Sequence, residues 1–209
     1  MTSIFHITEI SNLPSIINEG RLLCDNQMDA RKLTPTNIAH SHIKVRRKNT
    51  KVPCCKRGCL ADYVPFYFAP RSPMLYAISN GFIEGYTNGQ DEIIHLVVDA
   101  EKIDRNGLPY TFTDMHAVMI MCRFFTDLVH LDQIDWKLMR SRYWFDTNDY
   151  PDRKQRRQAE FLVYSQLEWN FIEEIGVRLE RTSRQVREII EQTKTTHIPD
   201  INVHREWYY

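Results

Sequence analysis

The chain has 209 residues, with 27 Lys and Arg against 27 Asp and Glu, and 43% of its residues are hydrophobic. This length suffices for one well-buried core and is short for two, so we expect a single domain over residues 1–209. No apolar run approaches the roughly 20 residues of a membrane span, and a net charge of zero does not by itself indicate a nucleic-acid-binding protein.

The N-terminal strand and helix come first in the chain. Ile4 to Thr8 is predicted to be a short strand, and Asn12 is predicted to cap a helix that begins near Pro14 and stops at Gly20. The start of the chain, residues 1–10, lacks the cationic and apolar segments of a secretory signal, so we expect a cytoplasmic protein.

Residues 28–58 are polar and basic with little periodicity, which predicts an irregular functional loop or a loop with one helix around residues 38–47. No acidic residue lies between Asp29 and Asp62, whereas nine Lys and Arg do. Such a cationic segment is either a solvated loop or a binding surface. A second basic cluster follows at residues 153–157.

The cysteines argue against a disulfide framework, because their number, five, is odd in a chain of this size. Three of them lie near two histidines: Cys54, Cys55, Cys59, His40 and His42. The spacing CCxxxC lacks the paired CxxC knuckles of a structural zinc site. We therefore expect free thiols and no metal.

Further strands are predicted at residues 62–68, 92–98, 108–113, 159–164, 174–178 and 201–203, and helices at 71–78, 124–141 and 183–193. Pro65 predicts that residues 62–68 form an edge or bulged strand. Because helices and strands do not alternate regularly, we expect an α+β fold. The seven glycines form no GxGxxG or GxxxxGK motif, so Rossmann and P-loop folds are not supported.

Seven short motifs then follow in order: His6-Ile7-Thr8, Lys51-Val52-Pro53, DYVPFYF at 62–68, Arg71-Ser72-Pro73-Met74-Leu75, Phe112-Thr113-Asp114-x-His116, QAEFLVY at 158–164, and Trp207-Tyr208-Tyr209. Together they resemble the DarT family of DNA-modifying toxins over essentially the whole chain. The resemblance implies an ADP-ribosyltransferase-like split β-core with peripheral helices, which binds NAD+ as co-substrate.

The implied reaction transfers ADP-ribose from NAD+ to a base in single-stranded DNA and releases nicotinamide, with thymine favoured over guanine as the acceptor. The resemblance also implies a toxin partnered by a DarG-like macrodomain antitoxin, and we expect a monomer that binds no membrane. An ADP-ribosyltransferase that acts on RNA or protein is an alternative. A non-catalytic module that binds single-stranded nucleic acid is another.

Glu160 precedes the apolar run from Phe161 to Tyr164, so it is predicted to project from the head of a strand. Cleavage of the glycosidic bond of NAD+ develops positive charge on the ribose, which a carboxylate offsets while it helps to activate the acceptor. Position alone is also compatible with a strand end in solvent. The resemblance implies the catalytic role.

Arg47 lies where the family has a catalytic arginine, and Arg46 is the alternative assignment. A guanidinium forks two donors onto a phosphate or a base carbonyl, so Arg47 is predicted to position NAD+ or the base. The family also gives this arginine the role of proton acceptor, which a pKa above about 12 opposes.

Binding residues are predicted from the same resemblance. NAD+ is assigned to His6, Ile7, Thr8, Ser15 and Leu23 together with Arg47, although a lone histidine on a strand is also compatible with a packed structural role. DNA is assigned to His116, Tyr143, Trp144, Arg46 and Lys48. His116 is alternatively a proton-transfer group or a buried structural partner, and the two aromatics either stack on a base or belong to the core.

Overall fold

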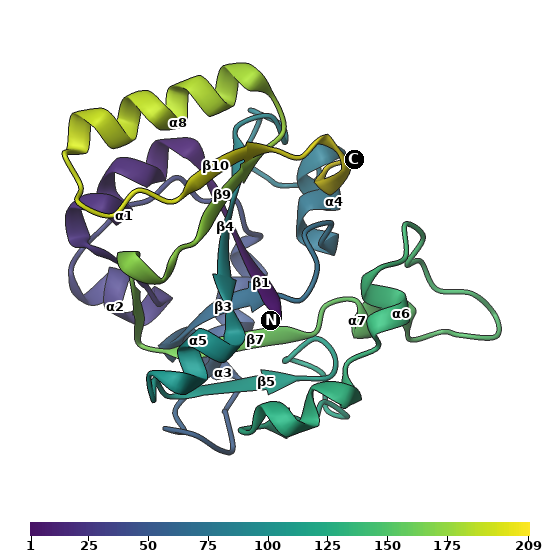
Figure 1. Cartoon of the computed structure of the whole chain (residues 1–209). Helices are drawn as coiled ribbons and strands as arrows, with labels where there is room; N and C mark the ends of the chain where they lie inside the picture. The colour runs from purple at the N-terminus through teal and green to yellow at the C-terminus, as the bar shows by residue number, and fades with distance from the viewer.

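The computed structural model describes residues 1–209, apart from the side chain of Ser41. A mixed sheet in the order β10-β9-β4-β1-β3-β7-β5-β6 forms its centre, and β2 pairs with β8 beside it (Figure 1). All neighbours in the large sheet are antiparallel except β9 and β10. The strands are β1 (Ser3–Glu9), β2 (Arg21–Leu23), β3 (Tyr63–Tyr67), β4 (Ile93–Asp99), β5 (Tyr110–Thr113), β6 (Phe124–Phe125), β7 (Glu160–Tyr164), β8 (Gln166–Glu168), β9 (Glu174–Val177) and β10 (Asp200–Val203).

The helices surround this sheet. They are α1 (Leu13–Glu19), α2 (Asp25–Ala30), α3 (Ser41–Asn49), α4 (Pro73–Ser79), α5 (Ala100–Arg105), α6 (Trp136–Met139), α7 (Arg153–Arg156) and α8 (Glu180–Thr193). α1 and α8 lie together beside β9 and β10 (Figure 1). Ile17 of α1 and Val186 of α8 are buried in the same core as Ile175 of β9, which is why both helices carry an apolar stripe. The predicted α+β class is confirmed.

The large sheet is split between β1 and β3. These strands pair at one position, Phe5 opposite Tyr67, whereas β1 and β4 pair from Ser3 with Asp99 to Glu9 with Ile93. The split predicted from the family resemblance therefore lies between the N-terminal strand and the strand that contains Pro65.

Residues 62–68 were predicted to form an edge or bulged strand, and the edge alternative is wrong because β3 lies between β1 and β7. Pro65 is opposite Leu162 of β7, and its carbonyl lies 2.9 Å from Nδ1 of His6 on the other side. In a strand the N and C=O of one residue point the same way, so the missing N–H of Pro65 faces the split and removes no ladder bond to β7.

The single helix predicted over residues 124–141 was also wrong. This segment contains β6, a 3-10 helix at Leu128–Gln133 and the short α6. The side chains of Asp127 and Asp135 accept hydrogen bonds from the backbone N–H groups of Val129 and Leu138, so each aspartate starts a new short element. The apolar spacing alone had suggested one continuous helix.

The other predicted elements are present with modest changes at their ends, and the helix predicted at 183–193 begins earlier, at Glu180. Within the basic segment, α3 is the predicted helix, and α2 precedes it. No sequence pattern indicated α2, α5, β2 or β8. Among the described residues, no helix is long and apolar enough to cross a membrane.

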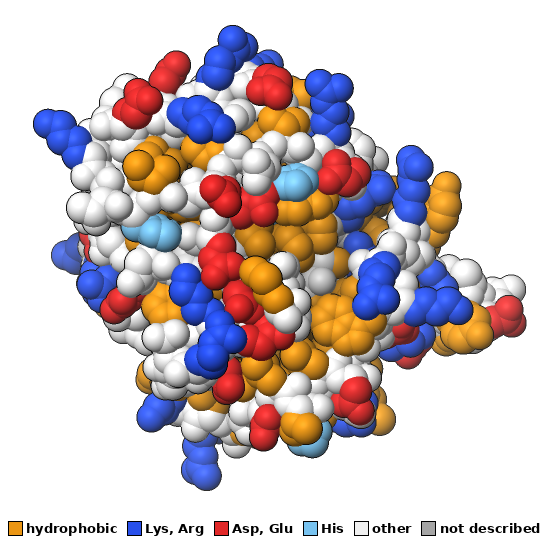
Figure 2. Space-filling model, viewed as in Figure 1, with side chains coloured by type: hydrophobic (Ala, Val, Ile, Leu, Met, Phe, Trp, Pro, Cys, Tyr) orange, Lys and Arg blue, Asp and Glu red, His pale blue; other side chains and the backbone are white. Residues whose placement is uncertain are grey.

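A lobe formed by the segment with α6 and α7 projects from one side of the sheet (Figure 1). Figure 2 shows Lys and Arg side chains gathered where this lobe meets the body of the molecule near α4 and the C-terminus. This part of the surface therefore carries several basic side chains although the chain as a whole is neutral.

Candidate active site

A cavity of about 840 Å³ lies at the split between β1 and β3, and α1, α2, α3 and α4 also contribute to its wall. Its volume is within the roughly 300–1,000 Å³ usual for small-molecule sites. Nine of the predicted site residues line it: His6, Ile7, Thr8, Ser15, Leu23, Arg47, His116, Trp144 and Glu160. Residues that are far apart in the sequence are thus brought to one concave surface.

Glu160 and Arg47 form an ion pair inside this cavity, with 2.6 Å between Oε2 and Nη1. Both residues are buried, with exposed fractions of 3% and 8%. The second guanidinium nitrogen of Arg47 donates to the carbonyl of Leu60 at 3.3 Å. The fork of Arg47 is therefore fixed between a carboxylate and the backbone.

The backbone around Glu160 is equally constrained. Its N–H donates to Oγ1 of Thr113 on the neighbouring strand β5 at 3.0 Å, and its Oε1 accepts from the N–H of Ala117 at 3.3 Å. Tyr67 of β3 lies opposite Glu160 on the other side of β7. Glu160 thus projects from a central strand that is paired on both sides, which is the rigid support that a catalytic carboxylate requires.

Each member of the pair stabilises the ionised form of the other. Burial opposes ionisation of Glu160, but the charge of Arg47, with smaller contributions from His116 and the hydrogen bonds, holds its pKa below the ordinary value of 4.5. Burial likewise opposes the charge of Arg47, and Glu160 outweighs it, so the pKa of Arg47 is raised. The pair is ionised at neutral pH, and Arg47 keeps its proton.

His116 is the third titratable group at this end of the cavity. Its Nε2 lies 4.0 Å from Oε1 of Glu160. Burial lowers the pKa of His116, and although Glu160 raises it, the charges of Arg47 and Arg46 act with burial. The imidazole is therefore neutral at pH 7 and has a free acceptor nitrogen, since a neutral histidine protonates one ring nitrogen and leaves the other unprotonated.

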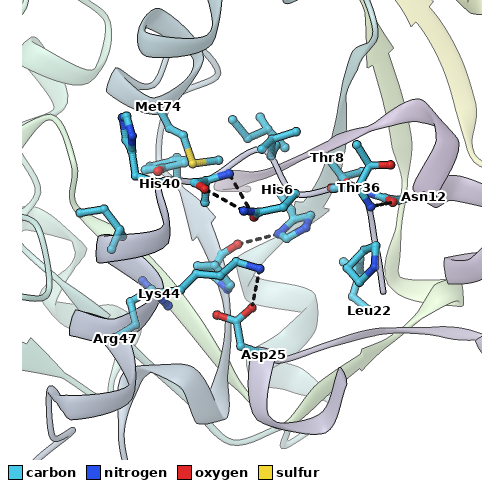
Figure 3. A pocket seen from close by; sticks show the side chains of 18 of the residues that line it. His6, Thr8, Asn12, Leu22, Asp25, Thr36, His40, Lys44, Arg47 and Met74 are labelled. Carbon is cyan, nitrogen blue, oxygen red and sulfur yellow. Dashed lines mark hydrogen bonds and ion pairs between the residues drawn. The ribbon is translucent and has the colours of Figure 1, made fainter. Parts of the chain in front are cut away.

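His6 and Thr8 of β1 lie at the split, and each side chain is held by a hydrogen bond (Figure 3). The side chain of His6 points into the cavity and contacts the carbonyl of Pro65, and burial lowers its pKa. Thr8 is buried and its hydroxyl accepts from Nδ2 of Asn12 at 3.1 Å. These residues present polar groups of fixed orientation to one wall of the cavity.

Asn12 holds a segment, residues 31–40, over the cavity. Asn12 was predicted to cap the first helix, but its side chain makes no capping hydrogen bond. Instead its Oδ1 accepts from the N–H of Thr36 at 2.7 Å and its Nδ2 donates to the carbonyl of Thr36 at 3.0 Å (Figure 3). We call this pair of bonds the Asn12–Thr36 clasp. No local sequence pattern indicated this clasp.

Lys44 is a further cavity residue that the sequence analysis did not single out. It lies on α3 three residues before Arg47, so both side chains project from the same helix face. Its Nζ is 3.9 Å from a carboxylate oxygen of Asp25 on α2 (Figure 3). The helical spacing within the basic segment was the available signal for this residue.

The predicted DNA-binding residues do not all lie at the cavity. Trp144 lines it but is only 1% exposed and packs on Phe145 with ring centroids 4.6 Å apart, which agrees with the alternative in which this residue belongs to the core. Tyr143 is 71% exposed and outside the cavity wall. Arg46 and Lys48 are exposed on the outer face of α3, and Lys48 pairs with Asp29 at 2.6 Å.

The cysteines of the basic segment are unoxidised, with Cys54, Cys55 and Cys59 half-buried. Among the described residues, no group of three or more His, Cys, Asp and Glu side chains is arranged to hold a metal ion.

Comparisons with known proteins show the family of this chain. A family model described as ssDNA thymidine ADP-ribosyltransferase, DarT, matches residues 5–209. The DNA ADP-ribosyl transferase of Thermus sp. (strain 2.9) is 44% identical over 208 residues, which cover 100% of this chain and 96% of the relative.

Solved structures of Thermus sp. 2.9 DarT have the same fold. The complex with ADP-ribosylated ssDNA superposes with a TM-score of 0.93 at 44% identity and covers 100% of this chain and 96% of the other. The complex with NAD+ gives a TM-score of 0.88 at 42% identity, with coverage of 100% and 98%. The chain therefore belongs to the DarT family of ssDNA thymidine ADP-ribosyltransferases.

Proposed function

We propose that the chain transfers ADP-ribose from NAD+ to a thymine base in single-stranded DNA and releases nicotinamide and a proton. The observation that carries this proposal is the buried ion pair between Glu160 and Arg47 in the wall of a cavity large enough for a dinucleotide. The Thermus relative, which is similar over its whole length, has been solved with NAD+ and with ADP-ribosylated ssDNA.

The residues of the cavity fit NAD+. Lys44 and Arg47 are cations on one helix face, suited to the negative pyrophosphate, and Ser15 lies in the first turn of α1. His6 and Thr8 offer fixed polar groups, and Ile7 and Leu23 are buried apolar neighbours. This combination of apolar wall and few oriented polar groups is typical of nucleotide sites that lack a glycine-rich loop.

Glu160 supplies the negative charge that the reaction requires. Positive charge develops on the ribose carbon as the bond to nicotinamide breaks, and a carboxylate fixed in a water-poor cavity stabilises that charge without reorganisation. Because the pKa of Glu160 is lowered, the group is ionised before substrates bind. The new bond then forms between this carbon and a nitrogen of the base, which loses its proton.

Arg47 positions the reactants in this proposal, since a guanidinium with a raised pKa is a poor proton acceptor. Neutral His116, 4.0 Å from Glu160, is better suited to receive the proton of the base. Exposed Tyr143, Arg46 and Lys48 remain candidates for contact with the DNA outside the cavity.

Thymine is the acceptor that the description of the matching family favours over guanine. Single strands are the expected substrate, because the edge of a base is hidden in a duplex and extrusion costs about a few kcal/mol. A cytoplasmic toxin restrained by a macrodomain antitoxin is the biological setting that the family resemblance supports.

The proposal is tested with NAD+ labelled in the adenosine half. The protein is incubated with single-stranded oligonucleotides in which either thymine or guanine is absent, and with RNA of the same sequences. Label is expected on thymine-containing DNA, with one nicotinamide released per adduct. Label confined to RNA or protein would refute the DNA assignment, and binding without nicotinamide release would indicate a non-catalytic module.

A further inference from the structure

A second cavity, of about 900 Å³, lies beside the candidate active site. An aromatic wall separates the two: Trp144 borders the active-site cavity, Tyr209 borders the second, and Nε1 of Trp144 donates to the hydroxyl of Tyr209 at 2.8 Å. Tyr76 packs edge-on against both rings, with centroids 5.6 and 5.1 Å away. The cavities are thus neighbours across a single aromatic layer.

The second cavity is strongly cationic. Its wall contains one acidic side chain, Glu206, and five arginines: Arg71, Arg140, Arg142, Arg157 and Arg205. The arginine ion pairs of the described residues belong to other side chains, such as Arg156 with Asp135 and Arg178 with Asp91. None of the five arginines of this cavity forms an ion pair with a described carboxylate, so the wall keeps an excess of positive charge.

Arg157 is the most buried of these arginines, with an exposed fraction of 3%. Its guanidinium donates to the backbone carbonyls of Arg71, Leu138, Met139 and Ser141 at 2.5–3.3 Å. Burial lowers the pKa of Arg157 to about 10, so the group is still charged at neutral pH. A buried charge that contacts carbonyl dipoles alone is costly, and an anion beside it would offset that cost.

Arg71 adds a second guanidinium at the same place. Its Cζ lies 4.3 Å from the centroid of the Tyr209 ring, and its buried Nε has no hydrogen-bond partner among the described atoms. Its charge lowers the pKa of Arg157, which means that the two cations repel one another. Two like charges held together by the fold, neither of them paired with a described carboxylate, form a site for an anion.

We propose that this second cavity binds a backbone phosphate of the single-stranded DNA whose modified base occupies the active site; the inference rests on the proposed function. Three short segments of the chain contribute one residue to each cavity. Pro73, Trp144 and Gln158 line the active site, and Arg71, Arg142 and Arg157, one or two positions earlier in the sequence, line the second cavity. A strand that leaves the active site at the aromatic wall therefore meets arginines at once. Aromatic rings next to arginines are the usual combination for single strands.

The test maps which phosphate the cavity holds. A series of fluorescent single-stranded DNA probes of about eight nucleotides is prepared, each with one thymine. Each probe carries one uncharged methylphosphonate linkage, and the position of this linkage differs from probe to probe. Anisotropy gives the Kd of each probe for the wild-type protein, Arg71→Gln, Arg142→Gln and the control Arg184→Gln. Arg184 is exposed on α8, so its replacement removes the same charge away from both cavities.

One linkage near the thymine is expected to weaken wild-type binding about tenfold when it is uncharged, as for loss of one charge-assisted contact. In Arg71→Gln the fully charged DNA binds about tenfold more weakly, that linkage no longer matters, and the slope of log Kobs against log salt falls by about 0.7. Arg142 is exposed, so its replacement leaves the core intact. Arg142→Gln is expected to weaken binding of the fully charged DNA less than Arg71→Gln does, and to reduce the effect of the uncharged linkage. Arg184→Gln keeps the wild-type profile.

The same linkage profile in wild type, Arg71→Gln and Arg142→Gln would overturn the inference. The inference would also be overturned if the cavity binds a free anion instead of DNA. In that case inorganic phosphate would raise the Tm of the wild type but not of Arg71→Gln, while the dependence of DNA binding on the position of the uncharged linkage would be the same in the two proteins. Failure of the proposed function is a different result, because the wild type would then label none of the charged oligonucleotides with ADP-ribose.

Discussion

Arg47 and Glu160 meet at 2.6 Å although 113 positions separate them in the sequence. Arg47 comes from the last turn of α3 and Glu160 from the first residue of β7. Both are nearly removed from water, so each depends on the other for compensation of its charge. Changes to this pair therefore affect catalysis and stability together, and experiments must separate the two.

Replacement of Glu160 by Gln keeps the size of the side chain and removes its charge. Nicotinamide release is expected to fall by at least about 100-fold, the usual cost of losing one preorganised electrostatic group. The variant is also expected to lose about 3–5 kcal/mol of stability, because Arg47 stays buried without a partner. Kinetics are measured well below the Tm of the variant, with Glu168→Gln, an exposed residue of β8, as control. Turnover of E160Q within a few-fold of wild type would contradict the role.

Acid is expected to weaken the fold through the same carboxylate. The pKa of Glu160 is lower in the folded chain than its ordinary value of 4.5, so its contribution to stability is fully present above pH 4.5 and is lost as the pH falls through the folded value. Urea unfolding at a series of pH values should give a free energy that decreases below pH 4.5 more steeply for wild type than for Glu160→Gln. Parallel curves for the two proteins would exclude the linkage.

Local sequence patterns predicted much of the fold. Ile4–Thr8, Phe161–Tyr164 and the α8 stripe at Val186 and Ile190 are regular apolar patterns, and each became the expected element. Glu160 and Arg47 were assigned from the family resemblance, and the structure places them in contact. The motif at Pro65 misled, because a proline indicates a sheet edge unless the sheet itself is split.

Contacts made by side chains over long distances could not be predicted in this way. Nothing near Asn12 indicates that its amide binds the backbone of Thr36, and capping is the common role of asparagine before a helix. The aromatic ring of Trp144 allowed either a stacking or a core role, and the contacts that bury it include a hydrogen bond to Tyr209, which is 65 positions away. Both outcomes were decided by packing, which local periodicity does not encode.

Thr113 is expected to position Glu160. Thr113→Val has nearly the same shape but loses the oxygen that accepts the N–H of Glu160. Thr111→Val is the matched control, because Thr111 is also fully buried on β5 and its hydroxyl bonds to Phe125 instead. Both variants should lose about 1–3 kcal/mol of stability, whereas kcat should fall in Thr113→Val alone, with KM for NAD+ little changed. Equal kcat in the two variants would limit Thr113 to a structural role.

The Asn12–Thr36 clasp is expected to affect binding of NAD+ more than chemistry. Asn12→Ala removes both bonds to Thr36, so the segment at 31–40 loses its attachment to the cavity wall. KM for NAD+ should rise about tenfold while kcat changes less than about threefold, since binding must then order the segment. Initial rates of nicotinamide release measure both constants, and Asn18→Ala on the exposed face of α1 is the control. An unchanged KM would show that the clasp does not preorganise the cavity.

His116 should determine the acid limit of activity. Burial lowers its pKa below the ordinary 6.5, so the imidazole stays neutral, and able to take a proton from the base, from about pH 8 down to 6.5. kcat/KM should be level over this range and decrease only at lower pH. His116→Gln should reduce the pH-independent value of kcat/KM by about 100-fold and abolish its decrease at low pH. His130→Gln, at an exposed site, should keep the wild-type pH profile. An acid limb that persists in His116→Gln would assign the proton transfer to a different group.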